Sequence, residues 1–225
     1  VGFVVQRIKD PVVAGFLLFE LCWRRGRRKW LLAACVAAGA MVACTPWTLR
    51  NYSAFHRFLF IRGNLGLELR IANHSGADPD IEVTLARQGT LRHPSENLEE
   101  AKKVRVLGEA EYMRQAKAEA LDWMRAHPAE FLWLTLQRAL HFWCGPLRIP
   151  WRAALTTAVT VLAFLGLRRA LPGLTRPGQA ALLIPLATFP LVYYFVSYVA
   201  HYPAPLAWIL LLLAAYEVRH WFKAG

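Results

Sequence analysis

The residues best suited to chemistry lie between positions 46 and 73, where an uncharged hydrophobic run gives way to a polar stretch. Arg50, His56, Arg57 and Arg62 stand there among aromatic residues. A guanidinium group pairs with phosphate oxygens through two parallel hydrogen bonds, and tryptophan and tyrosine favour the headgroup layer of a bilayer. We therefore expect this stretch to meet lipid phosphates at a membrane surface.

Six residues are candidates for binding a substrate or a lipid phosphate. Arg50 and Arg62 are suited to grip a phosphate, because arginine presents its donors in a fixed fork. The other four offer amide, imidazole or phenol groups to a sugar or a headgroup: Asn51, Asn73, His201 and Tyr202. The alternative for each of the six is ordinary lipid anchoring or hydrogen bonding within a loop.

Metal chemistry has little support in the sequence. Asp78-Pro79-Asp80 resembles a paired-carboxylate metal motif only superficially, because the proline and the turn residues around it predict a solvated loop. The histidines show no HExxH or other zinc spacing, and the sequence has no CxxC pair, no Gly-rich phosphate loop and no Ser/His/Asp order. We therefore expect neither a metal nor a cofactor.

The composition is typical of a membrane protein. Of the 225 residues, 56% are hydrophobic and 19% are charged, nine are tryptophan, and the apolar residues come in blocks. The formal net charge of +12 at pH 7 would also suit nucleic acid, but the basic residues lie beside hydrophobic spans and aromatic residues. This arrangement suits anionic lipid better than nucleic acid, so we expect membrane lipid as a partner and no nucleic acid.

The elements that position the candidate residues fall into three sections. Residues 1–47 are expected to hold transmembrane helices with a basic loop at 24–29, the second helix being stopped by Pro46. Residues 48–150 form a polar section, mostly helical with mixed structure. The chain closes with a bundle of three membrane segments over 151–225, at 153–167, 178–200 and 206–216. The expected fold class is mainly α, a polytopic transmembrane helix bundle with an additional polar section.

Basic loops predict the orientation of the chain in the membrane. Short loops rich in lysine and arginine stay in the cytoplasm, and three such stretches, at 24–29, 168–176 and 219–223, fall on one side. The polar section 48–150 then lies on the extracytoplasmic side. Its own arginines do not oppose this, because long translocated domains follow the charge rule only weakly.

The polar section is expected to contain three kinds of local structure. A tight turn around Gly66 precedes a short extended segment over 67–71. Residues 99–126 predict one amphipathic helix, and residues 130–143 predict a second helix that lies along the membrane surface or in the core of the section. The polar residues of this second helix gather on one side: Glu130, Gln137, Arg138 and His141.

Several of these stretches resemble a known family. The order Pro-Trp-Thr-Leu-Arg-Asn at 46–51, an aromatic-rich segment, Gly-Asn-Leu-Gly-Leu-Glu-Leu at 63–69 and Ala-Asn at 72–73 are similar to the second half of certain bacterial membrane glycosyltransferases. These enzymes form the protein mannosyltransferase and aminoarabinose transferase superfamily. The resemblance extends over roughly residues 12–218 and says little about the substrate.

Two later stretches agree with this resemblance. Residues 127–143, from His-Pro to Phe-Trp with Arg138 between them, are similar to the family's helix that approaches the next membrane span. His201-Tyr202-Pro203 resembles a Tyr-Arg-x-Pro element before the last helix, although no arginine follows the tyrosine here.

The resemblance implies a C-type glycosyltransferase fold in the bacterial inner (plasma) membrane. Such an enzyme moves a sugar from a polyprenyl-phosphate carrier to an extracytoplasmic acceptor, which is an envelope glycan, lipid or protein. The family's acidic catalytic residues belong to its first outer loop, which would precede Val1. The chain is therefore expected to be the carboxyl-terminal portion of such an enzyme, with no catalytic residue of its own and no activity alone.

Two functions from other classes stay open. A noncatalytic membrane module that binds an envelope partner predicts a large exposed apolar patch on residues 48–150. A small-solute transporter predicts charged groups in the middle of its spans, which the segments 30–47, 153–167 and 178–200 lack. A transferase instead predicts a cavity between the polar section and the outer helix ends.

Overall fold

The computed structural model consists of α-helices. It describes residues 2–23, 26, 28–55, 64–89 and 91–224, and in these ranges the only β pairing is an isolated bridge between Asp80 and Tyr198. The mainly α fold class is thereby confirmed at this coarse level. Arg62, His56, Arg57 and half of the basic loop at 24–29 lie outside the described residues.

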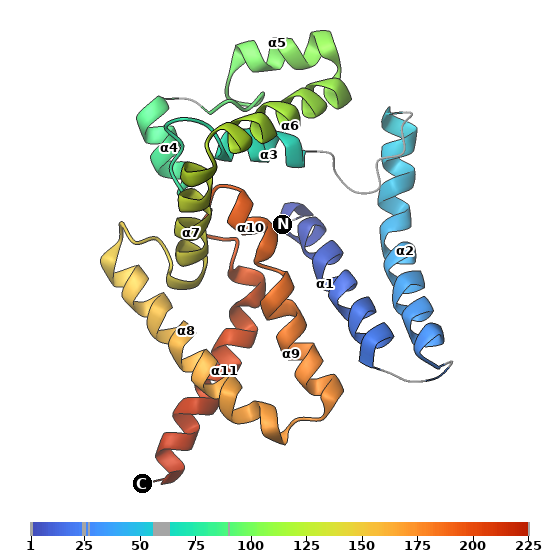
Figure 1. Cartoon of the computed structure of the whole chain (residues 1–225), viewed down its shortest axis with the longest axis vertical. Coiled ribbons are helices and arrows are strands. Elements are labelled where there is room, and N and C mark those ends of the chain that lie inside the picture. Colours follow the sequence, from blue (N-terminus) through green and yellow to red (C-terminus); the bar gives the residue numbers. More distant parts are fainter. Residues whose placement is uncertain (1, 24–25, 27, 56–63, 90, 225) are drawn as a thin grey trace. The chain divides into compact units, whose positions relative to one another are not determined.

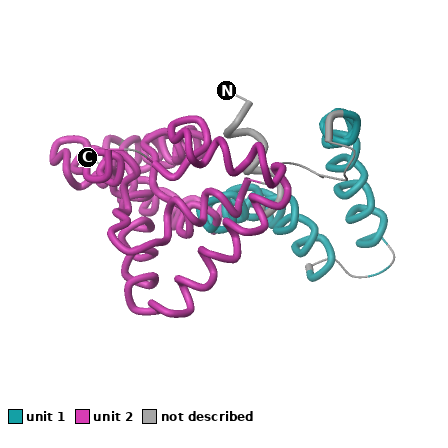
Figure 2. The backbone as a smooth tube through the Cα atoms, turned by 90° about the horizontal axis from the view of Figure 1, so that it is seen from above, with its two compact units in different colours: residues 1–63, 174–191 teal, residues 64–173, 192–225 magenta. Residues whose placement is uncertain are grey.

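The chain divides into two compact units, shown in two colours in Figure 2. The first comprises residues 1–63 and 174–191, with α1 (Gly2–Trp23), α2 (Arg28–Phe55) and α9 (Arg176–Thr188). The second comprises residues 64–173 and 192–225. Its α-helices, labelled in Figure 1, are α3 (Leu65–Ala72), α4 (Ile81–Gln88), α5 (Leu98–Leu107), α6 (Glu109–Ala126), α7 (Pro128–Cys144), α8 (Pro150–Ala170) and α11 (Ala204–Ala224), while α10 (Leu191–Phe195) starts at the boundary. The 3-10 turn η1 (Leu171–Gly173) follows α8.

Three helical segments of the described chain are long and apolar enough to cross a membrane: Arg28–Ser53, Pro150–Gly173 and Arg176–Phe195. They coincide with three of the membrane segments expected from the sequence. Helix α11, which contains the crossing expected at 206–216, is not among them, because polar residues in its second half lower its mean hydropathy. These helices are compatible with a membrane protein.

The prediction that Pro46 ends the second helix is wrong, because α2 continues well past this proline. A proline removes one hydrogen bond from the helical ladder, but helices in membranes tolerate it where side chains bond the backbone. The hydroxyl of Thr45 donates to the carbonyl of Met41 at 2.8 Å, and that of Thr48 donates to the carbonyl of Cys44 at 3.1 Å.

The membrane segment predicted over 178–200, with kinks at Pro185 and Pro190, corresponds to the candidate span Arg176–Phe195, but its helix is interrupted near Pro190 and ends before residue 200. Helix α9 ends at Thr188, the short helix α10 follows, and residues 196–200 are not helical. The backbone of Tyr198 bonds elsewhere instead: its N–H donates to the carbonyl of Pro79 at 2.7 Å, and its carbonyl accepts from the N–H of Ile81 at 3.2 Å. These two bonds fix the loop before α4 within the second unit.

The extended segment predicted over 67–71 is wrong as well, since these residues belong to α3. Their leucine and isoleucine residues alternate as in a strand, but six of the eight residues of α3 are buried, so the alternation does not mark a strand with one exposed face. Gly66 lies inside this helix rather than in a turn. A Cβ atom there would lie 2.4 Å from the carbonyl oxygen of Met113, so the glycine permits α3 to pack closely on α6.

The one helix predicted over 99–126 is two helices, α5 and α6, which meet at Gly108. This glycine has a φ of 76°, a backbone conformation that is strained for other residues. Hydrophobic periodicity continues through the break, so the sequence pattern does not reveal it.

A buried ion cluster joins α3, α5 and α6. Arg70 donates to the carboxylate of Glu100 and to the hydroxyl of Tyr112, both at 2.5 Å, and Tyr112 donates to Glu100 at 2.6 Å. Burial alone would raise the pKa of Glu100, but hydrogen bonds from Lys103, Tyr112 and Arg70 lower it to about 2. The carboxylate therefore stays ionised inside the unit.

We expect Glu100 to make the stability of the second unit sensitive to acid. Its pKa falls from 4.5 to about 2 on folding, which corresponds to about 3 kcal/mol of stabilisation at neutral pH. Because the folded pKa is the lower one, this stabilisation is present above about pH 5 and is lost as the pH falls toward 2. Denaturant unfolding across this range should show that Glu100→Gln lowers the midpoint at neutral pH and weakens its acid dependence.

The matched control for this measurement is Glu99→Gln, because the side chain of Glu99 is 73% exposed. It should leave both the midpoint and its acid dependence close to those of the wild type. If Glu100→Gln behaved in the same way as this control, the buried cluster would not be the source of the acid sensitivity.

Candidate functional site

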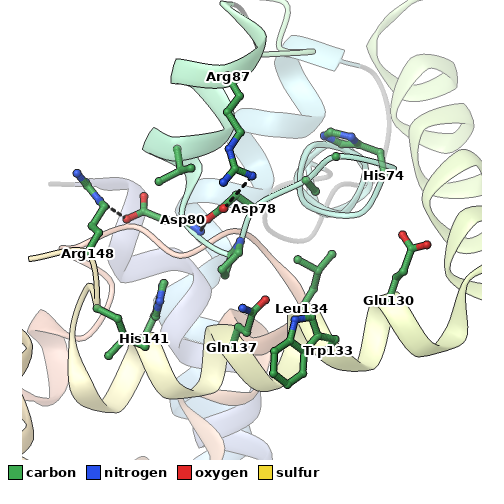
Figure 3. Close-up of a pocket in the computed structure, with 15 residues that line it drawn as sticks. His74, Asp78, Asp80, Arg87, Glu130, Trp133, Leu134, Gln137, His141 and Arg148 are labelled. Carbon is green, nitrogen blue, oxygen red and sulfur yellow. Dashed lines mark hydrogen bonds and ion pairs between the residues drawn. The ribbon is translucent and has the colours of Figure 1, made fainter.

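A pocket of about 620 Å³ lies within the second unit. One wall is the loop 74–80 with α4, and the other is α7 with the residues that follow it (Figure 3). The chemically active lining residues are His74, Asp78, Asp80, Arg87, Glu130, Trp133, Gln137, His141 and Arg148. In Figure 3, Gln137 and His141 project from α7 toward the loop that carries Asp78 and Asp80.

The solvated loop predicted at 78–80 is wrong, because Asp80 is only 3% exposed. Its carboxylate caps α4 by accepting from the backbone N–H of Glu82 at 2.9 Å, and it accepts from Nε of Arg148 at 2.9 Å. Asp78 accepts from the N–H of Asp80 at 3.0 Å and forms an ion pair with Arg87 at 3.2 Å. Both carboxylates are thus already used to build the loop.

The described part of the chain brings no three His, Cys, Asp or Glu side chains together in a group that would hold a metal ion. In the pocket, each of the two loop carboxylates already has an arginine partner. Glu130 and Gln137 are different, because their side chains make no hydrogen bond to any residue in the described ranges. They are two of the groups of the pocket that are open to a ligand.

Helix α7 has one face toward the pocket and an apolar face beside it. Glu130, Trp133, Gln137 and His141 recur every three or four residues and therefore share one side of the helix. Next to them run three exposed leucines, which we call the leucine ridge: Leu132, Leu136 and Leu140, with 64%, 52% and 45% exposure. Trp133, itself 60% exposed, lies where the two faces meet.

The remaining side of α7 carries a fully buried cation. Arg138 has no exposed surface, and its guanidinium donates to Oδ1 of Asn73 at 3.0 Å and to the carbonyl of Ala72. The amide of Asn73 donates in turn to the carbonyls of Leu69 and Phe195, at 2.8 and 3.0 Å. Burial lowers the pKa of Arg138 to about 10, so the guanidinium remains charged at neutral pH.

Of the site residues predicted from the sequence, the three that belong to the second unit, Asn73, His201 and Tyr202, do not line the pocket. Asn73 lies behind it, 1% exposed and fully engaged with Arg138 and two carbonyl groups. His201 is exposed, and the ring of Tyr202 packs on Tyr193 with centroids 4.5 Å apart. These contacts give Asn73 a structural role and leave His201 as a surface residue.

The other three predicted residues do not belong to the second unit. Arg50 is exposed at the end of α2, with its guanidinium 5.0 Å from the ring centre of Trp47. Asn51 is 5% exposed within the first unit, and Arg62 lies outside the described residues. A tryptophan beside an exposed arginine suits a membrane surface, so the headgroup role of Arg50 stays a prediction.

Sequence reasoning did not assign Trp133, Gln137 and Glu130 to a ligand site. The polar side of the helix at 130–143 was visible in the sequence, but it suited a helix along the membrane surface as well as a helix in the core of the polar section. In the structure Arg138 and His141 are buried, whereas the leucine ridge is exposed. A helix that buries its arginine and exposes its leucines suits an apolar environment, but amphipathicity is the same for either orientation, so the sequence alone did not reveal this arrangement.

We expect replacement of Arg138 to destabilise the second unit. Arg138→Leu leaves the oxygens of Asn73 and Ala72 without their donor in the interior, at a cost of about 3 kcal/mol or more. Arg138→Lys should recover only part of this loss, because a single ammonium group does not match the fork. Arg105→Leu, at an exposed position of α5, is the control for denaturant unfolding in detergent. Equal stability of the Arg138→Leu and Arg105→Leu variants would refute this role of the buried cation.

Comparison with known proteins gives no match: no protein-family model, no curated protein and no solved structure matches the chain. The similarity to membrane glycosyltransferases therefore rests on the sequence stretches quoted above. A function for the pocket follows only from its residues and from its place beside the leucine ridge.

Proposed function

We propose that this chain is the carboxyl-terminal portion of an integral membrane glycosyltransferase. Such an enzyme transfers a sugar from a polyprenyl-phosphate carrier to an extracytoplasmic acceptor, an envelope glycan, lipid or protein. Its helices form a polytopic bundle in the bacterial inner membrane, and residues 48–150 lie outside. Its partners are membrane lipid, the lipid-linked donor and the acceptor.

The proposal rests on one observation: one face of α7 lines the pocket, and the neighbouring face exposes the leucine ridge. A lipid-linked sugar has a polar ring and an apolar chain joined at one phosphate. Trp133, Gln137 and Glu130 offer a flat apolar surface, an amide and a carboxylate to the ring. The leucine ridge offers an apolar surface to lipid directly beside them.

The positions of the charged residues in the membrane segments favour a transferase over a small-solute transporter. In the three candidate spans the charged residues stand near the ends, as Arg28 and Arg50 do in α2 and Arg152 and Arg168 do in α8. Transporters place ionisable groups near the middle of their spans, where they hold ions or substrates. The pocket, by contrast, lies in the polar section.

The test of the proposed function is sugar transfer in reconstituted membranes. The chain, together with the amino-terminal half that the resemblance implies, should transfer labelled sugar from at least one polyprenyl-phosphate hexose, and the chain alone should not. Trp133→Leu should lower the rate at least tenfold. Trp208→Leu, at a 63% exposed position of α11, should leave the rate unchanged.

Sugar transfer by the 225-residue chain alone would show that the chain carries a catalytic group of its own, contrary to the proposal. An unaltered rate for Trp133→Leu would remove the pocket from the reaction.

The leucine ridge also favours a second function, a noncatalytic membrane module, because the same exposed surface suits a protein partner. The environment of the ridge separates the two. An environment-sensitive fluorophore attached to a cysteine at position 136, in lipid nanodiscs that hold only this protein, should emit as in an apolar medium. The same fluorophore at Arg114, an exposed polar position of α6, should emit as in water. Aqueous emission at both positions would favour the partner-binding module.

A further inference from the structure

His141 is a buried polar residue without a hydrogen-bond partner in the wall of the pocket. The residue is 9% exposed, and the Nδ1 atom of its ring is buried without a hydrogen-bond partner among the described residues. Its ring meets Tyr198 edge to face, with centroids 5.5 Å apart and an interplanar angle of 76°. A buried polar atom left unpaired destabilises the folded state, so its place in a pocket wall points to a partner on the ligand.

The charges around His141 leave it as a neutral acceptor. Burial lowers the pKa of His141, the carboxylates of Asp80 and Asp78 oppose this effect, and Arg148 adds to it. Both carboxylates are already paired with arginines. With Tyr198 packed on the ring, these are the groups that face it. A neutral imidazole accepts a hydrogen bond at one of its two nitrogens, and with Nδ1 as that nitrogen the partner it lacks is a donor such as a hydroxyl.

The spacing along α7 sets the length of that ligand. Trp133, Gln137 and His141 are separated by four residues each and lie in one line on the pocket face. At the rise of a helix, Trp133 and His141 are about 12 Å apart along its axis. One sugar ring stacked on Trp133 does not extend over this distance, whereas two linked rings do.

We infer that the pocket takes a glycan of at least two sugar rings. One ring lies on Trp133, and a hydroxyl of the next ring donates its hydrogen bond to His141. Gln137, between them, reaches the linkage or either ring. This inference rests on the proposed function, since it names the kind of sugar chain that the transferase holds in its polar section, and it makes His141 a specificity-determining residue.

The experiment is a binding titration with the purified chain in nanodiscs, using glucose, maltose and cellobiose as probes. At least one disaccharide should bind tenfold or more tightly than glucose. His141→Phe keeps a ring against Tyr198 but removes both nitrogens, so it should erase the preference for the disaccharide over glucose. Trp133→Leu should weaken the binding of all three sugars.

A pH series gives an independent measure of the same contact. As the pH falls below the lowered pKa of His141, the imidazole becomes a cation and loses its acceptor. The preference for the disaccharide should then fade in the wild type and stay absent in His141→Phe. The unfolding midpoint of His141→Phe should be no lower than that of the wild type, because no partner within the described protein is lost.

Three results would overturn the inference: equal affinity for glucose and both disaccharides, an unchanged preference in His141→Phe, or no binding of any probe. None of them decides the proposed function, which the transfer assay with lipid-linked donors tests separately. A wild-type transfer rate together with any of these results would retain the transferase and reject the two-ring pocket.

Discussion

Arg138 donates to carbonyl and amide oxygens in the interior of the second unit and forms no ion pair with a carboxylate in the described chain. A buried guanidinium is tolerated only where fixed dipoles replace water around it. Here they come from the end of α3, from Asn73 and from the end of α10. The arginine thereby joins α7 to the end of α3 and to the end of α10, directly behind the pocket.

The loop 74–80 leaves this point and forms the wall opposite α7. Its conformation is fixed by Asp78 and Asp80, which are held by Arg87 and Arg148, and by the short backbone bridge to Tyr198. The charged groups of the loop are thus consumed in building it. What remains open to a ligand is on α7: a carboxylate, an amide, an indole and an imidazole along one face. This division between scaffold and open groups is what makes the pocket a candidate site.

The sequence predicted those elements whose apolar residues repeat over a long stretch. The helix at 130–143 and the span at 153–167 correspond to α7 and α8 within a few residues. Residues 67–71 were misassigned because their apolar residues alternate as in a strand. Helix α2 continues through Pro46, although a proline in the sequence predicts a helix end. The break at Gly108 depends on a single backbone angle, which periodicity does not encode.

The candidate site was harder to predict than the fold. Arginines beside aromatic residues drew attention to residues 46–73, but Asn73 is structural and Arg50 lies in the other unit. The pocket instead joins a loop at 74–80 with a helix some fifty residues later, and only tertiary structure brings them together. The polar side of α7 was visible in the sequence. That this side points inward, with leucines outside, was not, because amphipathicity is the same for either orientation.

The proposed function requires that the pocket opens beside the outer surface of the membrane. Its most direct test is cysteine accessibility in intact cells, in a background without the four native cysteines. A membrane-impermeant maleimide should label a cysteine at Glu130 without permeabilisation, and should label one at Arg168 only after the membrane is opened. Labelling at position 130 that required permeabilisation would place the pocket in the cytoplasm and contradict the proposed sugar transfer outside it.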